Sequence, residues 1–239
     1  METISKLVQC DRKLQALQLR KQTMIEINGD YKNYSRGVRS VLKAQRKQLA
    51  GIRGAVADLL LVPNPYEVAL EVILGDKLEC IITETEEDAL LAINYLRQHR
   101  QGRVAFIPLN RVQGKRMSEQ GERQLSQVKG FRGVALDLVA FDPVYRDVFT
   151  YLLGQTIIVD SLEVAIRCLP LIGKGEKIVT LHGEVIHNNG TIVGGTRTAA
   201  RGHMPLMRNR AMAEIDLEIQ TIEKERAALQ KSKSNLNKR

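Results

Sequence analysis

Two histidines and a glutamate near the end of the chain could in principle hold a metal ion. His182 and His187 flank a short segment that contains Glu184. Alternate residues of a β-strand face the same side, so positions 182 and 184 would share one face while position 187 would point away. Because the three side chains would diverge in an extended conformation, we expect no metal site here.

Two aspartates stand in matching sequence contexts and could form an acid–base pair. Asp58 lies in Gly-Ala-Val-Ala-Asp-Leu and Asp137 in Gly-Val-Ala-Leu-Asp-Leu. Paired carboxylates can share general acid and general base roles. Their matching local setting favours a repeated structural role instead, such as capping or a backbone hydrogen bond.

No nucleotide-binding loop is recognisable. The segment 173–177, Gly-Lys-Gly-Glu-Lys, is glycine-rich and basic, but it lacks the spacing of a phosphate-binding loop and precedes a strand-like run. We interpret it as a turn. No helix directly follows the glycines at 190–195, which argues against a dinucleotide fingerprint. No Ser, His and Asp set stands in a nucleophile context. We therefore expect no enzyme activity and no cofactor.

The stretch 183–196 carries the clearest local signal. A strand-like run ending at Ile186 leads into Asn188-Asn189-Gly190, and Thr191-Ile192-Val193 follows before Gly194-Gly195. Asn and Gly tolerate positive φ, so the pattern predicts a strand, a tight turn and a second strand. The paired glycines leave the backbone uncovered by side chains. Two interpretations remain: an ordinary hairpin before a linker, or a sheet edge shaped to accept a partner strand.

Charge divides the chain into three parts. Residues 1–53 carry 12 basic and 4 acidic side chains, residues 54–196 carry 14 and 18, and residues 197–239 carry 10 and 5. An acidic centre thus lies between two basic arms. The arms are either solvated helices or part of a polyanion-binding surface. Three distant cysteines without a C-x-x-C pair, no long apolar run and no signal-peptide character fit a reducing cytoplasm.

Both arms show the apolar spacing of coiled coils. Apolar residues recur at spacings of three and four in each arm, interrupted by single charged positions: Leu7, Cys10, Leu14, Leu17, Lys21 and Met24, then Met212, Ile215, Ile219, Ile222, Arg226, Leu229, Lys233 and Leu236. Each helix needs a partner along one narrow stripe. We expect the arms to pair antiparallel with each other; the alternative is two surface helices packed on the centre.

The centre contains an internal repeat at an offset of 79 residues. The matching pairs are Gly54 and Gly133, Asp58 and Asp137, Tyr66 and Tyr145, and Gly75 and Gly154. Each copy reads as strand, helix, strand, helix, strand, which predicts two similar α/β subdomains related by an approximate two-fold axis. The intervening segment, about 110–130, is polar and is expected to be an exposed, mobile linker.

Together these features resemble the hinge domain of bacterial structural-maintenance-of-chromosomes (SMC) proteins. The stretches that carry the resemblance span almost the whole chain: 34–42, 51–59, 66–71, 74–75, 102–109, 141–146, 153–154, 178–183 and 190–195. One departure is Asn189, where the family often has glycine; asparagine also tolerates left-handed geometry.

The resemblance implies a toroidal homodimer with two interfaces, each joining one subdomain to the other subdomain of the partner. The dimerisation residues it implies are Gly190, Thr191, Ile192, Val193, Gly194 and Gly195. It also implies ATPase heads and further condensin subunits, both outside this chain, and a nucleoid-associated location.

The resemblance further implies non-specific DNA binding at the junction of hinge and arms. The matching candidates are Lys32, Arg36, Arg39, Lys43, Arg46, Lys47 and Arg53. Most of them share one side of a helix, without interleaved aromatic residues. We therefore expect contacts to the DNA backbone, strong salt dependence and little sequence preference.

The expected architecture is a mixed α/β, duplicated two-subdomain hinge with antiparallel coiled-coil arms. The expected boundaries are an arm at 1–33, subdomains at 34–120 and 121–197, and an arm at 198–239. Two other hypotheses remain: an α/β nucleotide-binding enzyme with helical extensions, and a DNA-binding helical hairpin with a globular spacer.

Overall fold

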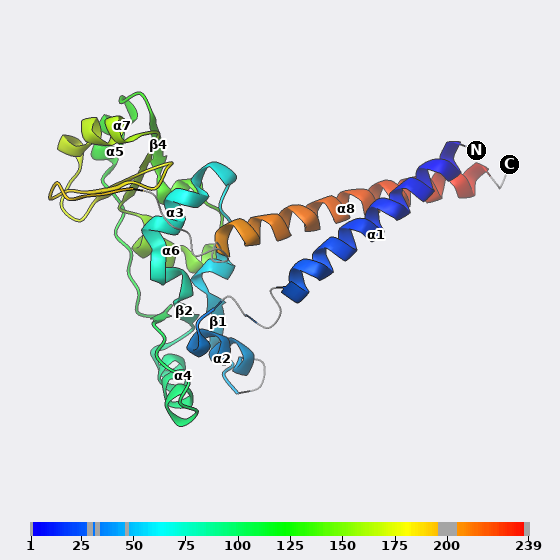
Figure 1. Cartoon of the computed structure of the whole chain (residues 1–239), viewed down its shortest axis with the longest axis horizontal. Coiled ribbons are helices and arrows are strands. Elements are labelled where there is room, and N and C mark those ends of the chain that lie inside the picture. Colours follow the sequence, from blue (N-terminus) through cyan, green and yellow to red (C-terminus); the bar gives the residue numbers. More distant parts are fainter. Residues whose placement is uncertain (1, 28–30, 32–33, 46–47, 196–204, 237–239) are drawn as a thin grey trace. The chain divides into compact units, whose positions relative to one another are not determined.

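A computed structural model describes residues 2–27, 31, 34–45, 48–195 and 205–236. The chain divides into two compact units, one of Met1–Asp30 with Arg208–Arg239 and one of Tyr31–Met207 (Figure 1). Among the described residues, no helix is both long and apolar enough to cross a membrane.

The first unit is a pair of long helices, α1 (Glu2–Ile27) and α8 (Pro205–Leu236), which lie side by side (Figure 1). The apolar residues predicted to form the seam point inward: Leu7, Cys10, Leu14 and Ile215 are buried. The side chains of Lys233 and Leu236 lie outside the described residues. The intramolecular coiled coil predicted from the heptad pattern is confirmed.

Two of the three charged seam positions, Lys21 and Arg226, each have an acidic partner on the opposing helix. Lys21 Nζ lies 2.5 Å from Asp216 Oδ1, and Arg226 Nε lies 2.8 Å from Asp11 Oδ1. Asp11 and Lys21 are ten residues apart on α1. Their partners, Arg226 and Asp216, are ten residues apart on α8 in the opposite order. The ion pairs therefore fix an antiparallel register, which the heptad pattern alone left open.

The second unit contains two sheets. The first has the order β1-β2-β3, formed by β1 (Ile52–Ala55), β2 (Ile81–Thr83) and β3 (Phe106–Pro108). The second has the order β4-β5-β6-β7-β8, formed by β4 (Phe131–Val134), β5 (Thr156–Val159), β6 (Lys177–Thr180), β7 (Val185–His187) and β8 (Ile192–Val193). In each sheet the first pair is antiparallel and the second is parallel. The strands β7 and β8 add an antiparallel hairpin to the second sheet only.

Helices connect these strands in the repeated order that the sequence predicts. The α-helices are α2 (Arg36–Ala44), α3 (Glu67–Leu74), α4 (Glu86–Gln98), α5 (Glu119–Ser126), α6 (Arg146–Leu153) and α7 (Leu162–Cys168). The 3₁₀ turns are η2 (Val56–Leu59), η3 (Asn64–Tyr66), η4 (Gly75–Glu79), η5 (Ala135–Leu138), η6 (Pro143–Tyr145) and η7 (Leu169–Leu171). The mixed α/β, duplicated fold is thus confirmed.

Two strands of the first copy are shorter than the apolar stretches that contain them. The apolar run from Gly54 to Leu60 is not one strand, because β1 ends at Ala55 and a 3₁₀ turn follows. Strand β3 begins only at Phe106, after the segment 103–105. Both segments are apolar enough for a strand, so tertiary packing decides where each strand ends.

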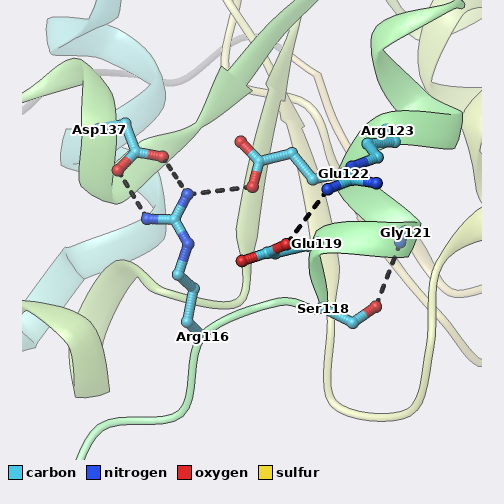
Figure 2. Close-up of polar contacts among 7 residues, drawn as sticks. All are labelled: Arg116, Ser118, Glu119, Gly121, Glu122, Arg123 and Asp137. Atoms are coloured by element: carbon cyan, nitrogen blue, oxygen red, sulfur yellow. Dashed lines mark hydrogen bonds and ion pairs between the residues drawn. The ribbon is translucent and has the colours of Figure 1, made fainter.

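The predicted linker at 110–130 holds a helix, α5. The Ser118 hydroxyl caps it by accepting a hydrogen bond from the Gly121 amide at 3.2 Å (Figure 2). Buried Met117 and Leu125 anchor this otherwise polar segment to the core. Helix α5 crosses the expected boundary at 120/121, and we propose that the second subdomain begins before it.

The repeated aspartates hold the segments that precede α2 and α5. The Tyr34 hydroxyl donates to Asp58 at 2.7 Å. The Arg116 guanidinium donates to both carboxylate oxygens of Asp137 at 2.6 Å and to Glu122 at 3.0 Å (Figure 2). The role is structural, as the repeat suggests, but the partners are side chains of another segment rather than backbone amides.

The approximate two-fold axis passes beside Leu61. This residue forms an isolated antiparallel bridge with Ala140, which lies exactly one repeat offset later. The Leu61 amide donates to the Ala140 carbonyl at 2.8 Å, and the reverse bond measures 2.9 Å. A residue that pairs with its own repeat counterpart must lie next to the axis that relates the copies.

One hydrophobic core runs through both copies. It includes Leu70 of α3 and Phe149 of α6, together with Ile82 and Ile158 from the two sheets. In Figure 1, α3 and α6 lie between the first and second sheets. A smaller cluster, centred on Val41, covers the other face of the first sheet beneath α2 and α4.

The arm register predicts which seam residues can be crosslinked. Cys10 should lie across from the turn of α8 that contains Leu229, so Leu229→Cys should give an intramolecular product with a short bis-maleimide. Burial raises the pKa of the Cys80 and Cys168 thiols, and both cysteines are replaced by serine so that only Cys10 and the introduced cysteine can react. Glu225→Cys, on the exposed side of α8, is the control. Products linking only different chains would contradict the register.

The Arg116 network predicts an asymmetry between two neighbouring arginines. Arg116→Met should lower the free energy of unfolding by about 1 kcal/mol, a value discounted because the pair is partly exposed. Arg123→Met removes an ion pair to Glu119 whose side chains are 81% and 86% exposed, so it should have almost no effect. Urea denaturation of both variants makes the comparison, and equal effects would argue against an anchoring role for Arg116.

Candidate interaction surfaces

The hairpin predicted near residue 190 is present and ends the second sheet. The Gly190 amide donates to the His187 carbonyl at 2.9 Å, and the Thr191 amide donates to the Asn189 side chain at 3.0 Å. The left-handed position is Gly190, with φ of 85°. Asn189 contributes through its side chain rather than through positive φ. We call β7, β8 and the residues up to Gly195 the edge hairpin.

Among the described residues, no strand pairs with the outer edge of β8. Ile192 and Val193 are 51% and 55% exposed. His187 bonds to Thr191, so by alternation along an antiparallel ladder the amide and carbonyl groups of Ile192 and Gly194 point away from β7. A Cβ added at Gly195 would meet no atom within 4 Å. A second backbone could therefore approach this edge closely.

Strand β3 offers a second open edge, which the sequence analysis did not identify. Ala105 and Leu109 bond to β2, so the intervening Phe106 and Pro108 direct their free backbone groups outward. Proline within a sheet is typical of an edge strand, because it cannot donate to a neighbouring strand. Pro108 was the sequence signal that could have marked this edge.

Helix α2 presents three of the predicted DNA-binding residues on its outer side. Arg36 and Lys43 are exposed, and Arg39 is half-buried. Arg36 donates to the Gln101 side chain at 2.9 Å, and Arg39 donates to the Tyr34 carbonyl at 3.1 Å. We call Arg36, Arg39 and Lys43 the basic face.

The inner side of α2 is closely packed. A Cβ on Gly37 would come within 2.7 Å of Val104, so a larger residue would displace the segment beside it. This segment carries exposed Arg103, a basic residue near α2 that the sequence analysis missed. Only its place in the fold, not its spacing, could have shown it.

The remaining DNA-binding candidates differ in their surroundings. Lys32, Arg46 and Lys47 lie outside the described residues. Arg53, on β1, forms an ion pair with Glu84. In the second copy Arg132 pairs with Asp160 at the matching place, so the Arg53 pair belongs to the repeated architecture.

The candidates for chemistry do not assemble into a site. Glu184 binds the Thr180 hydroxyl. Among the described residues, no three His, Cys, Asp or Glu side chains group closely enough to hold a metal ion. The segment 173–177 forms the predicted turn, closed by the Gly173 amide, which donates to Glu176 at 2.7 Å.

Residues 49–169 match the sequence profile of the family described as "SMC proteins Flexible Hinge Domain". The chain belongs to the SMC hinge family. Among solved structures, an asymmetric dimer of the Geobacillus stearothermophilus SMC hinge domain is 32% identical, with a TM-score of 0.86, and the match covers 96% of this chain and 91% of that one. The Pyrococcus furiosus SMC hinge domain is 30% identical, with a TM-score of 0.55, covering 81% and 92%.

The SMC hinge also matches longer curated proteins. The "Chromosome partition protein Smc" of Bacillus subtilis is 33% identical over 232 residues, which is 97% of this chain but 19% of that protein. A protein of the same name from Halothermothrix orenii is 37% identical over 194 residues, or 81% of this chain and 16% of that protein. The chain thus spans less than a fifth of the length of these relatives.

Proposed function

We propose that this SMC hinge joins two copies of its chain by pairing β8 of one with β3 of the other. The observation that carries the proposal is a difference between the two sheets. Strands β1, β2 and β3 correspond to β4, β5 and β6, but the edge hairpin extends only the second sheet. The outer edge of β3 therefore has no hairpin beside it, and a partner's β8 can occupy that side.

The two edges offer complementary backbone groups. Ile192 and Gly194 on β8 provide outward amides and carbonyls, and β3 provides those of Phe106 with the Pro108 carbonyl. Two-fold symmetry turns one such contact into two equal contacts, which close a ring and leave neither edge open. The Geobacillus hinge is described as an asymmetric dimer, which supports the association of two copies but not the equality of the two contacts.

Ile192 allows a clean test of the β8 contact. Ile192→Lys should produce a folded monomer, because a lysine on an edge strand opposes strand addition. Ile166→Lys on α7 is the matched control, since both isoleucines are 51% exposed. Gly195 is a poorer choice because its φ of 118° would strain any side chain.

Sedimentation equilibrium over a range of concentrations gives the mass of each variant. The parent chain and Ile166→Lys should both be dimers at micromolar concentration. A dimeric Ile192→Lys variant would reject the β8 contact, and a monomeric parent chain would reject dimerisation.

We also propose that the basic face contacts the DNA backbone. A comparison of α2 with α5, the corresponding helix of the second copy, supports a functional role for the positive charge on α2. Helices α2 and α5 begin after Ser35 and Ser118. When the helices are aligned at these serines, at an offset of 83 rather than 79 residues, Arg36 and Arg39 correspond to Glu119 and Glu122. The same scaffold position is thus basic in one copy and acidic in the other, so the fold itself does not require a cation there.

Charge reversal tests this surface. Arg36→Glu with Lys43→Glu should weaken binding to a fluorescent duplex by more than about tenfold at low salt, and should reduce the salt-dependence slope by about two. Arg123→Glu with Lys129→Glu, at two exposed positions, makes the same charge change elsewhere. Equal loss in both double variants would indicate a response to net charge and contradict a localised site. Neither double variant should change the mass of the dimer in sedimentation equilibrium.

We infer the wider role from the relatives, whose names refer to chromosome partition. In the full-length protein, the hinge would connect arms that lead to ATPase heads and to further condensin subunits on the nucleoid. Contact with DNA close to the point where the two copies meet would then place the DNA beside the connection that holds the arms together.

A further inference from the structure

Four lysines gather around the end of α6, on a part of the unit that the proposed dimer and DNA contacts do not use. The Lys177 amide donates to the Gln155 carbonyl at 3.1 Å, just after α6. Lys77 Nζ lies 5.7 Å from the ring centroid of Tyr151, on the last turn of α6. The two lysines come from different copies of the repeat.

Two further lysines lie beside this pair. The Lys115 carbonyl is 2.7 Å from the position that a Cβ on Gly154 would occupy. Lys174 belongs to the turn that leads into Lys177, and both Lys115 and Lys174 are exposed. We call Lys77, Lys115, Lys174 and Lys177 the lysine cluster.

The charge of the lysine cluster has no counterion within the described part of the chain. None of the four forms an ion pair with a described acidic residue. Of the nearby carboxylates, Glu176 accepts from the Gly173 amide at 2.7 Å and Glu79 accepts from the Ser35 amide at 3.2 Å, while Asp76 precedes Lys77 in the chain without forming an ion pair with it. Burial, and then the charge of Lys77, lowers the pKa of Lys177. Among the described residues, no ion pair relieves the repulsion between these two cations.

A buried hydroxyl lies next to Lys177 on the same face of the sheet. Thr156 and Lys177 are direct partners in the parallel pairing of β5 and β6, and His187 is the partner of Lys177 on β7. Directly paired residues project from the same face. Thr156 is 1% exposed, and its Oγ1 has no hydrogen-bond partner, although buried hydroxyls normally have one. The unpaired Thr156 hydroxyl therefore lies in one row with Lys177 and His187 across three neighbouring strands.

The C-terminal end of α6 explains only part of this arrangement. Helix carbonyls favour cations, but the macrodipole amounts to roughly half a unit charge. Four lysines exceed what one short helix can balance. Lys77, moreover, reaches α6 from the other copy of the repeat.

We propose that the lysine cluster binds a phosphate-type oxyanion, supplied either as free inorganic phosphate or as a phosphodiester of a nucleic acid. Lys77 and Lys177 would supply the principal charges. Such an anion would relieve the repulsion between the two copies of the repeat at this point. This site is distinct from the basic face, which lies on α2 against the first sheet.

The test compares two probes on the intact chain. Inorganic phosphate is titrated while backbone amide resonances are followed by NMR, and a fluorescein-labelled single-stranded oligonucleotide is titrated by polarisation. Lys77→Gln is exposed and should fold normally, and Lys77→Gln with Lys177→Gln should weaken binding by about tenfold or more. Lys177→Arg should retain binding. Lys129→Gln, in the turn before β4, is the matched control.

Each outcome decides the proposal. Phosphate shifts near Gln155 and Gly175 that vanish in the double variant would support a free-phosphate site. Loss of oligonucleotide binding alone, in a chain whose basic face is already reversed at Arg36 and Lys43, would support a nucleic-acid phosphate. Absence of binding by both probes, or binding that the double variant leaves unchanged, would overturn the proposal without touching the basic face.

Discussion

The reciprocal pair of hydrogen bonds between Leu61 and Ala140 is the constraint on which the arrangement of the second unit depends. Two backbone hydrogen bonds contribute only about 1 kcal/mol each, so the shared core must supply most of the stability. What the bridge supplies is alignment. It sets the copies in one symmetric relation, so that α3 and α6 bury their apolar sides in a common core. That relation leaves the β3 edge and the edge hairpin at the margins of the two sheets.

Much of this fold could be predicted from local pattern. Heptad spacing predicted both arms, and the residues around Gly190 predicted the edge hairpin, because both signals lie within a few neighbouring residues. Helix α5 was missed because a polar segment was interpreted as a linker, although Met117 and Leu125 anchor it. The arm register and the Asp137 contact join residues distant in sequence. Only tertiary packing could reveal them, as with the open edge of β3.

The two copies repeat some of their ion pairs but differ in the charge of corresponding helices. Arg53 with Glu84 and Arg132 with Asp160 repeat the same clamp between neighbouring strands. The outer sides of α2 and α5 carry opposite charge. The two copies therefore share one fold but differ at the surface. Only the second copy carries the edge hairpin, and the charges on α2 and α5 are opposite.

The antiparallel register of the arms also orders events during synthesis. Helix α1 ends at Ile27, and its partner begins at Pro205. At about 5–20 residues per second, a ribosome needs on the order of ten to forty seconds to make the intervening chain. During that interval the stripe of Leu7, Cys10 and Leu14 cannot pack against α8 of its own chain, because α8 has not yet been synthesised. Lys21 interrupts this stripe with a charge, which would limit mispairing between neighbouring nascent chains until α8 emerges.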